Sequence, residues 1–166
     1  MSQGFINHLA HTILSKRRDR IEKSGVLCFP TEIKTRPCIL VVDDEYLIRE
    51  SVKRILESES YIVVTAAEGA ELVDIVNKIP IDLIILDVHL PWVNGIELCK
   101  LLRDPRFKMS NIPLLFLSGN NEQEVKKLAF DSGCDDYLVK PVDPSYLINT
   151  IKTLIKISQP FIQTYS

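Results

Sequence analysis

The most constraining stretch of the sequence covers residues 81–95, where an apolar run gives way abruptly to a turn. Four apolar residues, Leu83 to Leu86, are followed at once by the carboxylate of Asp87. A continuous apolar run of this length is typical of a strand buried on both faces, as in a parallel sheet. Pro91 and the Asn94–Gly95 pair then predict a turn. Asp87 is therefore expected where a buried strand emerges into a loop, the edge at which ligands bind in open α/β sheets.

The same alternation of apolar runs and helical periodicity extends over most of the chain. Strands are predicted at 38–42, 61–65, 82–87, 112–117 and 136–139, each followed by a helical pattern. Asn121, with Glu124 three residues later, resembles a capping box at the start of one helix, and Gly133 is expected to end that helix. Asp143–Pro144 is expected to cap the last helix. Five β–α units between about residues 37 and 157 predict an α/β fold, a doubly wound parallel sheet with helices on both faces.

Four of these strands end in polar residues. They are Asp43 and Asp44, then Asp87, then Ser118, and finally Lys140. Right-handed crossovers place the carboxyl ends of parallel strands at one edge of the sheet, so these side chains are expected to lie together. Individually, each has an ordinary explanation as a helix cap, a turn or a solvated loop. In the order acid, acid, hydroxyl and lysine on successive strands, they favour a functional site.

The chemistry of this set indicates phosphoryl transfer. Three carboxylates in one crevice repel one another unless a cation joins them, and an oxygen-only ligand set suits Mg²⁺. Asp87 could then attack phosphorus as a carboxylate nucleophile and form an aspartyl phosphate. Lys140 would bring positive charge to the phosphoryl group, and the Ser118 hydroxyl could donate a hydrogen bond to one of its oxygens.

Four motifs closely resemble the receiver domain of bacterial two-component response regulators. They are Ile39 to Glu45, Asp82 to Pro91 with Asn94–Gly95, Pro113 to Gly119, and Gly133 to Pro141. The resemblance covers about residues 37–157. It implies a flavodoxin-like (βα)5 fold with five parallel strands in the order 2-1-3-4-5.

The resemblance also implies a role for each site residue. Asp87 corresponds to the phosphoacceptor. Asp44 and Asp87, with the backbone carbonyl of His89, correspond to the Mg²⁺ ligands, and Asp43 supports the metal through water. Ser118 and Lys140 correspond to the residues that contact the phosphoryl group. Tyr137 matches the switch aromatic, which turns inward when Ser118 is drawn to the phosphate.

The resemblance predicts a signalling protein that takes its phosphoryl group from a histidine kinase or a phosphotransfer protein. It would act on a downstream protein target, through a homodimer, or by passing the group on. An interaction module that docks partners without phosphorylation is the alternative, and the complete acidic set with Ser118 and Lys140 favours the first. A flavin- or nucleotide-binding protein is disfavoured because no glycine-rich phosphate loop follows the first strand.

Composition bounds the setting of the protein. No apolar run approaches the ~20 residues that span a membrane, and no secretory signal is evident. The four cysteines have no metal-type spacing, so reduced thiols and a cytoplasmic location are expected. About nine residues follow the last predicted helix, too few for a helix-turn-helix module, so direct DNA binding is not expected.

Residues 1–36 lie outside the resemblance and are expected to form a basic extension and linker. They carry a net charge of +4, which leaves −6 on the rest of the chain. A helix is possible over 5–22, where Phe5, Leu9 and Ile13 recur at helical spacing. A solvated extension, a helix docked on the domain or on a second copy, and a partner or membrane-surface anchor are the three interpretations. Residues 158–166 are expected to be a loose tail.

This boundary predicts the behaviour of a shortened chain. A protein that begins at Arg36 should fold and accept phosphate with Mg²⁺ like the full chain, because all the predicted strands lie beyond residue 37. Circular dichroism and phosphate incorporation would measure both properties. An insoluble or unreactive product would place the extension inside the domain core.

Overall fold

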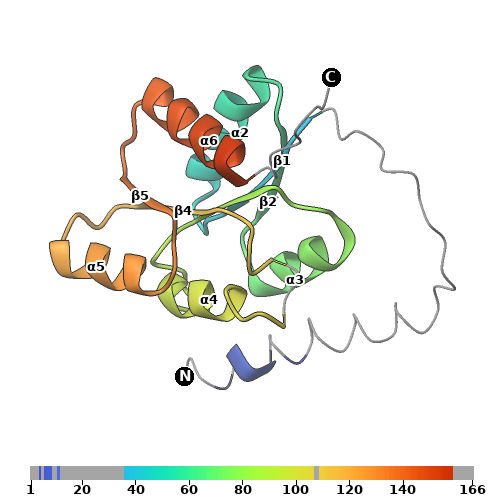
Figure 1. Ribbon diagram of the computed structural model, residues 1–166, viewed down its shortest axis with the longest axis vertical. Helices are drawn as coiled ribbons and strands as arrows, with labels where there is room; N and C mark the ends of the chain where they lie inside the picture. The colour runs from blue at the N-terminus through green and yellow to red at the C-terminus, as the bar shows by residue number, and fades with distance from the viewer. Residues whose placement is uncertain (1–3, 5, 9–10, 12–35, 107–108, 159–166) are drawn as a thin grey trace, which may run out of the picture.

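The computed structural model describes residues 4, 6–8, 11, 36–106 and 109–158, and its elements alternate between strand and helix (Figure 1). In chain order they are β1 (Cys38–Val42), α2 (Tyr46–Ser58), β2 (Ile62–Ala66), α3 (Gly69–Lys78), β3 (Leu83–Leu86), α4 (Gly95–Leu102), β4 (Leu114–Ser118), α5 (Gln123–Asp131), β5 (Asp136–Val139) and α6 (Pro144–Ser158). The strands form one five-stranded parallel sheet in the order β2-β1-β3-β4-β5. The predicted doubly wound fold and strand order are confirmed, with strand ends shifted by one or two residues.

Two layers of helices cover the sheet (Figure 1). Helices α2 and α6 lie on one face, and α3, α4 and α5 lie on the other. Successive residues of a strand point to opposite faces, so the central strands supply side chains to two separate apolar clusters. In β1, Ile39 and Val41 join the α2–α6 side, while Leu40 and Val42 join the α3–α4–α5 side. All four residues of β3 are buried, which explains why that strand reads as an uninterrupted apolar run.

The parallel register places the polar strand ends side by side. Val42 of β1 pairs with Leu86 of β3, so the next residues, Asp43 and Asp87, emerge together at the carboxyl edge. The Asp87 N–H donates to the Val42 carbonyl at 2.9 Å, which carries the pairing one step past the strand. In the same way, the Lys140 N–H donates to the Ser118 carbonyl at 2.8 Å.

The predicted helix boundaries have mixed outcomes. Asp143 caps α6 as expected, because its Oδ1 accepts a hydrogen bond from the Tyr146 N–H at 3.0 Å. The Asn121 capping box is wrong, since the cap position of α5 is Glu122 and no side chain caps that helix. The Asn94–Gly95 pair forms a helix start, with Asn94 Oδ1 accepting from the Ile96 N–H at 2.8 Å.

Most of the predicted 5–22 helix lies outside the described residues. Residues 4, 6–8 and 11 are helical, and Ile6 is 9% exposed within the α3–α4–α5 apolar cluster. The 12–35 part of the extension and the tail from residue 159 also lie outside the described residues. Across the described portion of the chain, no helix combines the length and apolar character needed to cross a membrane.

Among the described residues, one residue other than glycine holds a backbone conformation that favours glycine. Ser60, between α2 and β2, has φ = 67°, and the Arg36 Nε–H donates to its carbonyl at 2.7 Å. The left-handed region costs a residue with a Cβ about 1 kcal/mol, whereas glycine adopts it freely.

Replacing Ser60 with glycine should therefore raise the free energy of unfolding by up to about 1 kcal/mol, measured by urea denaturation. Ser58→Gly is the matched control, because Ser58 is the last residue of α2 and a glycine there should destabilise by about 0.5 kcal/mol. Equal losses at the two positions would show that conformational strain at Ser60 has no measurable effect.

Candidate functional site

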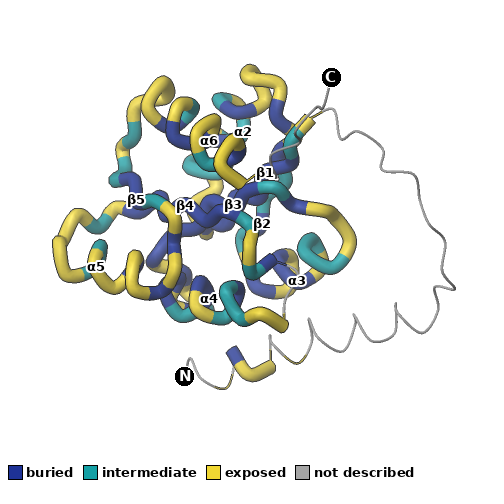
Figure 2. Tube along the Cα trace, in the orientation of Figure 1, coloured by how far each residue is buried: buried dark blue, intermediate teal, exposed yellow. Residues whose placement is uncertain are grey.

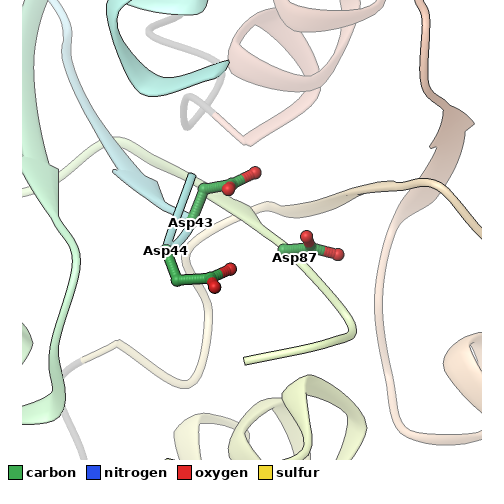
Figure 3. A group of neighbouring side chains, drawn as sticks. All are labelled: Asp43, Asp44 and Asp87. Atoms are coloured by element: carbon green, nitrogen blue, oxygen red, sulfur yellow. The ribbon is translucent and has the colours of Figure 1, made fainter. Parts of the chain in front are cut away.

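Three carboxylates gather at the carboxyl edge of the sheet (Figure 3). Asp43 and Asp44 follow β1, and Asp87 follows β3. One oxygen from each lies within 4.8 Å of the others, a spacing at which a single metal ion could bind all three. Asp43 and Asp87 are buried, whereas Asp44 is exposed. We call these residues the acidic cluster; its oxygen-only donor set and its open side fit a hard divalent cation such as Mg²⁺.

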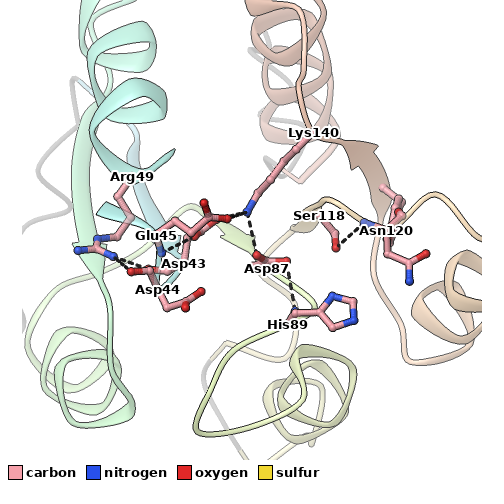
Figure 4. Close-up of polar contacts among 10 residues, drawn as sticks. Asp43, Asp44, Glu45, Arg49, Asp87, His89, Ser118, Asn120 and Lys140 are labelled. Carbon is pink, nitrogen blue, oxygen red and sulfur yellow. Dashed lines mark hydrogen bonds and ion pairs between the residues drawn. The ribbon is translucent and has the colours of Figure 1, made fainter. Parts of the chain in front are cut away.

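Lys140 crosses the top of the sheet from the end of β5 to the acidic cluster (Figure 4). Its Nζ lies 2.5 Å from Asp43 Oδ2 and 2.8 Å from Asp87 Oδ2. The ammonium therefore bridges the two buried carboxylates and offsets their mutual repulsion. The carboxylate of Glu45, which is largely exposed, lies 3.7 Å from the same nitrogen.

Burial and pairing act in opposite directions on these groups. Burial raises the pKa of Asp43, because it penalises the carboxylate form more than the hydrogen bond from Lys140 favours that form. Burial alone would lower the pKa of Lys140, but its hydrogen bonds to Asp43 and Asp87 outweigh that effect and the pKa is raised. The ammonium is therefore retained throughout the neutral range, and the site keeps a fixed positive charge.

Arg49 fixes the backbone of the loop that carries Asp43 and Asp44. Its Nη1 donates to the Asp43 carbonyl at 2.7 Å and to the Asp44 carbonyl at 2.8 Å (Figure 4). The Glu45 N–H donates to Asp43 Oδ1 at 2.9 Å and orients that carboxylate. Arg49 was not among the residues predicted to belong to the site. A cation in the first turn of a helix opposes the helix dipole, and that mismatch is the signal that could have found it.

The loop after β3 is closed tightly beneath Asp87. A Cβ on Gly95 would lie 2.1 Å from the Asp87 backbone oxygen, so this position admits no side chain. The Gly95 N–H donates to the Val88 carbonyl at 2.7 Å, which brings the start of α4 against the strand end. His89 has an exposed side chain, and its N–H donates to Asp87 Oδ1 at 3.2 Å.

Trp92 ties this loop to the neighbouring one. Its Nε1–H donates to the Ala67 carbonyl, between β2 and α3, at 3.0 Å. The indole is half-buried and packs against the apolar cluster on that face. The two loops on this side of the acidic cluster are therefore joined by the hydrogen bond of one side chain.

Ser118 and Tyr137 both form a hydrogen bond with the backbone of Asn120. The Ser118 Oγ, which is fully buried, accepts from the Asn120 N–H at 3.3 Å. The Tyr137 hydroxyl donates to the Asn120 carbonyl at 2.7 Å, and the ring is 8% exposed. Burial raises the pKa of the Tyr137 hydroxyl, against the opposing effect of its hydrogen bond with Ser118. The expected switch aromatic therefore lies inward in this structure.

Two neighbours help to hold the Tyr137 ring. The ring centroid of Phe116 lies 6.0 Å away at a tilted angle, and the Lys126 ammonium lies 5.9 Å from the Tyr137 centroid. Both contacts are within the range of favourable aromatic and cation–π interactions.

The structure thus brings Asp43, Asp44, Asp87 and Lys140 into direct proximity, with Ser118 and His89 beside Asp87 (Figure 4). Tyr137 is placed behind Ser118, one hydrogen-bonded residue away. The sequence had placed these residues at one edge on topology alone. It had not predicted the Lys140 bridge or the supports from Arg49, Gly95 and Trp92.

Comparison with known proteins agrees with this arrangement. Residues 39–152 match the family model described as the response regulator receiver domain. The chain is 38% identical over 119 residues to the aerobic respiration control protein ArcA of Escherichia coli, covering 72% of this chain and 48% of that protein. It is 38% identical over 121 residues to the alkaline phosphatase synthesis transcriptional regulatory protein PhoP of Bacillus subtilis, covering 73% and 49%. The chain thus spans about half the length of these relatives.

Solved structures show the same likeness. The chemotaxis protein CheY4 of Vibrio cholerae is 31% identical with a TM-score of 0.66, covering 72% of this chain and 99% of that one. A putative response regulator from Chloroflexus aurantiacus is 32% identical with a TM-score of 0.69, covering 74% and 99%. The family model matches more than two thirds of this chain. The chain therefore belongs to the response regulator receiver domain family of two-component systems.

Proposed function

We propose that this protein is a phosphoacceptor that takes a phosphoryl group onto Asp87 and signals through the resulting change at Ser118 and Tyr137. The observation that carries the proposal is the bridge from Lys140 to Asp43 and Asp87. A buried ammonium that pairs two carboxylates holds positive charge where a phosphoryl group needs it. A module that only docks partners has no need of this arrangement.

In the proposed reaction, an Asp87 carboxylate oxygen attacks phosphorus of a phosphohistidine. A new O–P bond forms as the N–P bond breaks, and the imidazole leaves with the bonding pair and takes up a proton. The Lys140 ammonium, 2.8 Å from Asp87 Oδ2, can stabilise the charge on the phosphoryl oxygens. The Asp87 Oδ1 atom accepts from the His89 N–H, so the carboxylate is already oriented.

A divalent ion would be held by Asp44, Asp87 and the His89 carbonyl, with Asp43 acting through water. The acidic cluster supports this assignment because its three carboxylates lie within reach of one ion. Mg²⁺ bound there would neutralise phosphoryl charge and orient one of its oxygens. Arg49 and the Glu45 N–H hold the Asp43–Asp44 loop through hydrogen bonds that use no carboxylate oxygen of Asp44 or Asp87.

The donor in this proposal is a histidine kinase or a phosphotransfer protein, and the output is a protein–protein contact or onward transfer. The chain is also similar to a segment of a sensor protein. It is 36% identical over 113 residues to the CAI-1 autoinducer sensor kinase/phosphatase CqsS of Vibrio cholerae. That match covers 16% of CqsS and 68% of this chain. It supports a place for this domain beside kinases in a phosphotransfer pathway, which would be cytoplasmic.

The hydrogen bonds around Asn120 supply the route from phosphate to surface. Ser118 binds the N–H of residue 120, and Tyr137 binds the carbonyl of the same residue. If the Ser118 hydroxyl turns toward a phosphoryl oxygen, the residue 120 backbone loses one of its two anchors. The surroundings of the Tyr137 ring, whose hydroxyl binds the carbonyl of the same residue, then change as well. A local event at the phosphoryl group would in this way alter the protein surface.

The first test is chemical. Incubation with a small phosphodonor and Mg²⁺ should add one phosphoryl group, and Asp87→Asn should abolish the addition because an amide is a poor nucleophile. Intact-mass spectrometry measures the product. Asp131→Asn, a change at an exposed carboxylate at the end of α5, is the matched control and should label like the wild type. Equal labelling of the Asp87→Asn variant would remove Asp87 from the reaction.

The second test concerns coupling. Beryllium fluoride, standing in for the phosphoryl group, should shift the NMR signals of the Asn120 amide and the Tyr137 ring in the wild type. Ser118→Ala should still accept phosphate, more slowly, but should lose most of that shift because no hydroxyl moves. Ser145→Ala, at an exposed position in α6, should behave as the wild type. A full shift in Ser118→Ala would show that the signal bypasses Ser118.

A further inference from the structure

The N-terminal extension makes a contact that the receiver family does not account for, since the family match begins at residue 39. Among the described residues before Arg36, Gly4, Asn7, His8 and His11 are exposed. Ile6 alone of this group is buried, with 9% of its surface exposed. An apolar side chain on a helical turn loses its contact with water only when another surface covers it.

The covering surface belongs to the apolar cluster on the α3–α4–α5 face of the sheet. Ile6 belongs to the same buried cluster as Leu72 of α3 and Leu98 of α4. Figure 1 draws the short helical segment near the N-terminus beside α4, and Figure 2 shows that part of this segment is buried. Val76 and Leu101, which are half-buried on these two helices, pack against the same cluster. This face therefore has apolar side chains to offer an incoming helix.

The sequence of the extension suits such a surface. Ala10 and Ile13 follow Ile6 at four and seven positions, the spacing that keeps apolar residues on one helical face. An isolated helix of this length is marginal in water and gains its stability from packing. A helical turn with its isoleucine buried is therefore evidence of docking.

Charge on the two partners is complementary. Residues 16–23 contain five basic and two acidic side chains. Helix α3 presents exposed acids at its start and on its surface, Glu68, Glu71 and Asp74, against the single Lys78. Surface charges of opposite sign add little affinity at physiological salt, but they disfavour a wrong orientation and favour a basic segment near α3.

We propose that the N-terminal segment is an intramolecular ligand of its own receiver domain, anchored by Ile6 on the α3–α4 face. The occupant is this chain's own residues 1–24. Helix α5 contributes Ala129 to the same cluster, but its Leu128 and Phe130 side chains stay exposed. An outside partner could therefore bind these exposed side chains of α5 while the extension is docked. This inference does not depend on phosphorylation of Asp87.

Amide hydrogen exchange on the full-length protein tests the proposal. Ile6→Asp places a charge on the anchor and should speed exchange in α3 and α4 about tenfold, the effect of losing one buried aliphatic contact. Helices α2 and α6, on the opposite face of the sheet, should be unchanged. Asn7→Asp adds the same charge at an exposed neighbouring position and is the matched control, with exchange like the wild type. Ile6→Ala should give a smaller change in the same two helices.

Three results would overturn the proposal. Equal exchange in Ile6→Asp and Asn7→Asp would mean that the segment does not dock. Faster exchange in all helices of Ile6→Asp would make Ile6 part of the folding core instead of a docked ligand. Protection of α3 and α4 in the wild type that disappears on dilution would assign the face to a second copy of the chain.

Discussion

The ammonium of Lys140, held between two buried carboxylates, is the interaction on which the site depends. Asp43 and Asp87 sit at the ends of adjacent strands, and two ionised carboxylates removed from water are costly without a cation. The bridging contacts at 2.5 and 2.8 Å supply that cation from β5, two strands away from β3. The strand order and the length of a lysine side chain together make the bridge possible. A shorter side chain at residue 140 would leave two buried negative charges facing each other.

The rest of the site serves to hold the peptide backbone around this bridge. Arg49 binds the carbonyls of the first acidic loop, and Trp92 joins the second loop to its neighbour. The absence of a side chain at Gly95 allows α4 to begin against the Asp87 carbonyl. None of these three contacts uses a carboxylate of the acidic cluster. The chain segments that carry the acidic cluster are therefore held by contacts in which its carboxylate oxygens take no part.

The fold and the core of the site could be predicted because both depend on patterns local to the sequence. Apolar runs that stop at Asp43, Asp87 and Ser118 mark strand ends, and parallel topology then brings those ends together. Some observed strand limits differ from the predicted ones by one or two residues, because an apolar residue beside a strand packs like one inside it. The roles of the site residues remain proposals, because they concern a reaction and not an arrangement.

The contacts that were not predicted depend on how segments of the chain approach one another in the folded structure. The Asn121 cap failed because two other polar contacts are better placed: Asn120 Oδ1 accepts from the Glu122 N–H at 2.7 Å, and Asn121 Oδ1 accepts from Lys126. Arg103 likewise donates to the carbonyls of Ile112 and Gly133, which lie 9 and 30 residues further along the chain. Side chains that bind distant backbone carbonyls leave no periodic pattern. Only the assembled sheet shows which carbonyls are within reach.

Trp92 gives the molecule an optical property that follows directly from its place in the fold. It is the sole tryptophan of the chain, and its indole N–H is hydrogen-bonded to a carbonyl of a different loop. Indole emission is sensitive to that bond and to the polarity around the ring. Any event that separates the loop after Asp87 from the loop after β2 therefore alters the ultraviolet fluorescence of the unlabelled protein. The chain carries its own reporter beside the acidic cluster, free of background from other indoles.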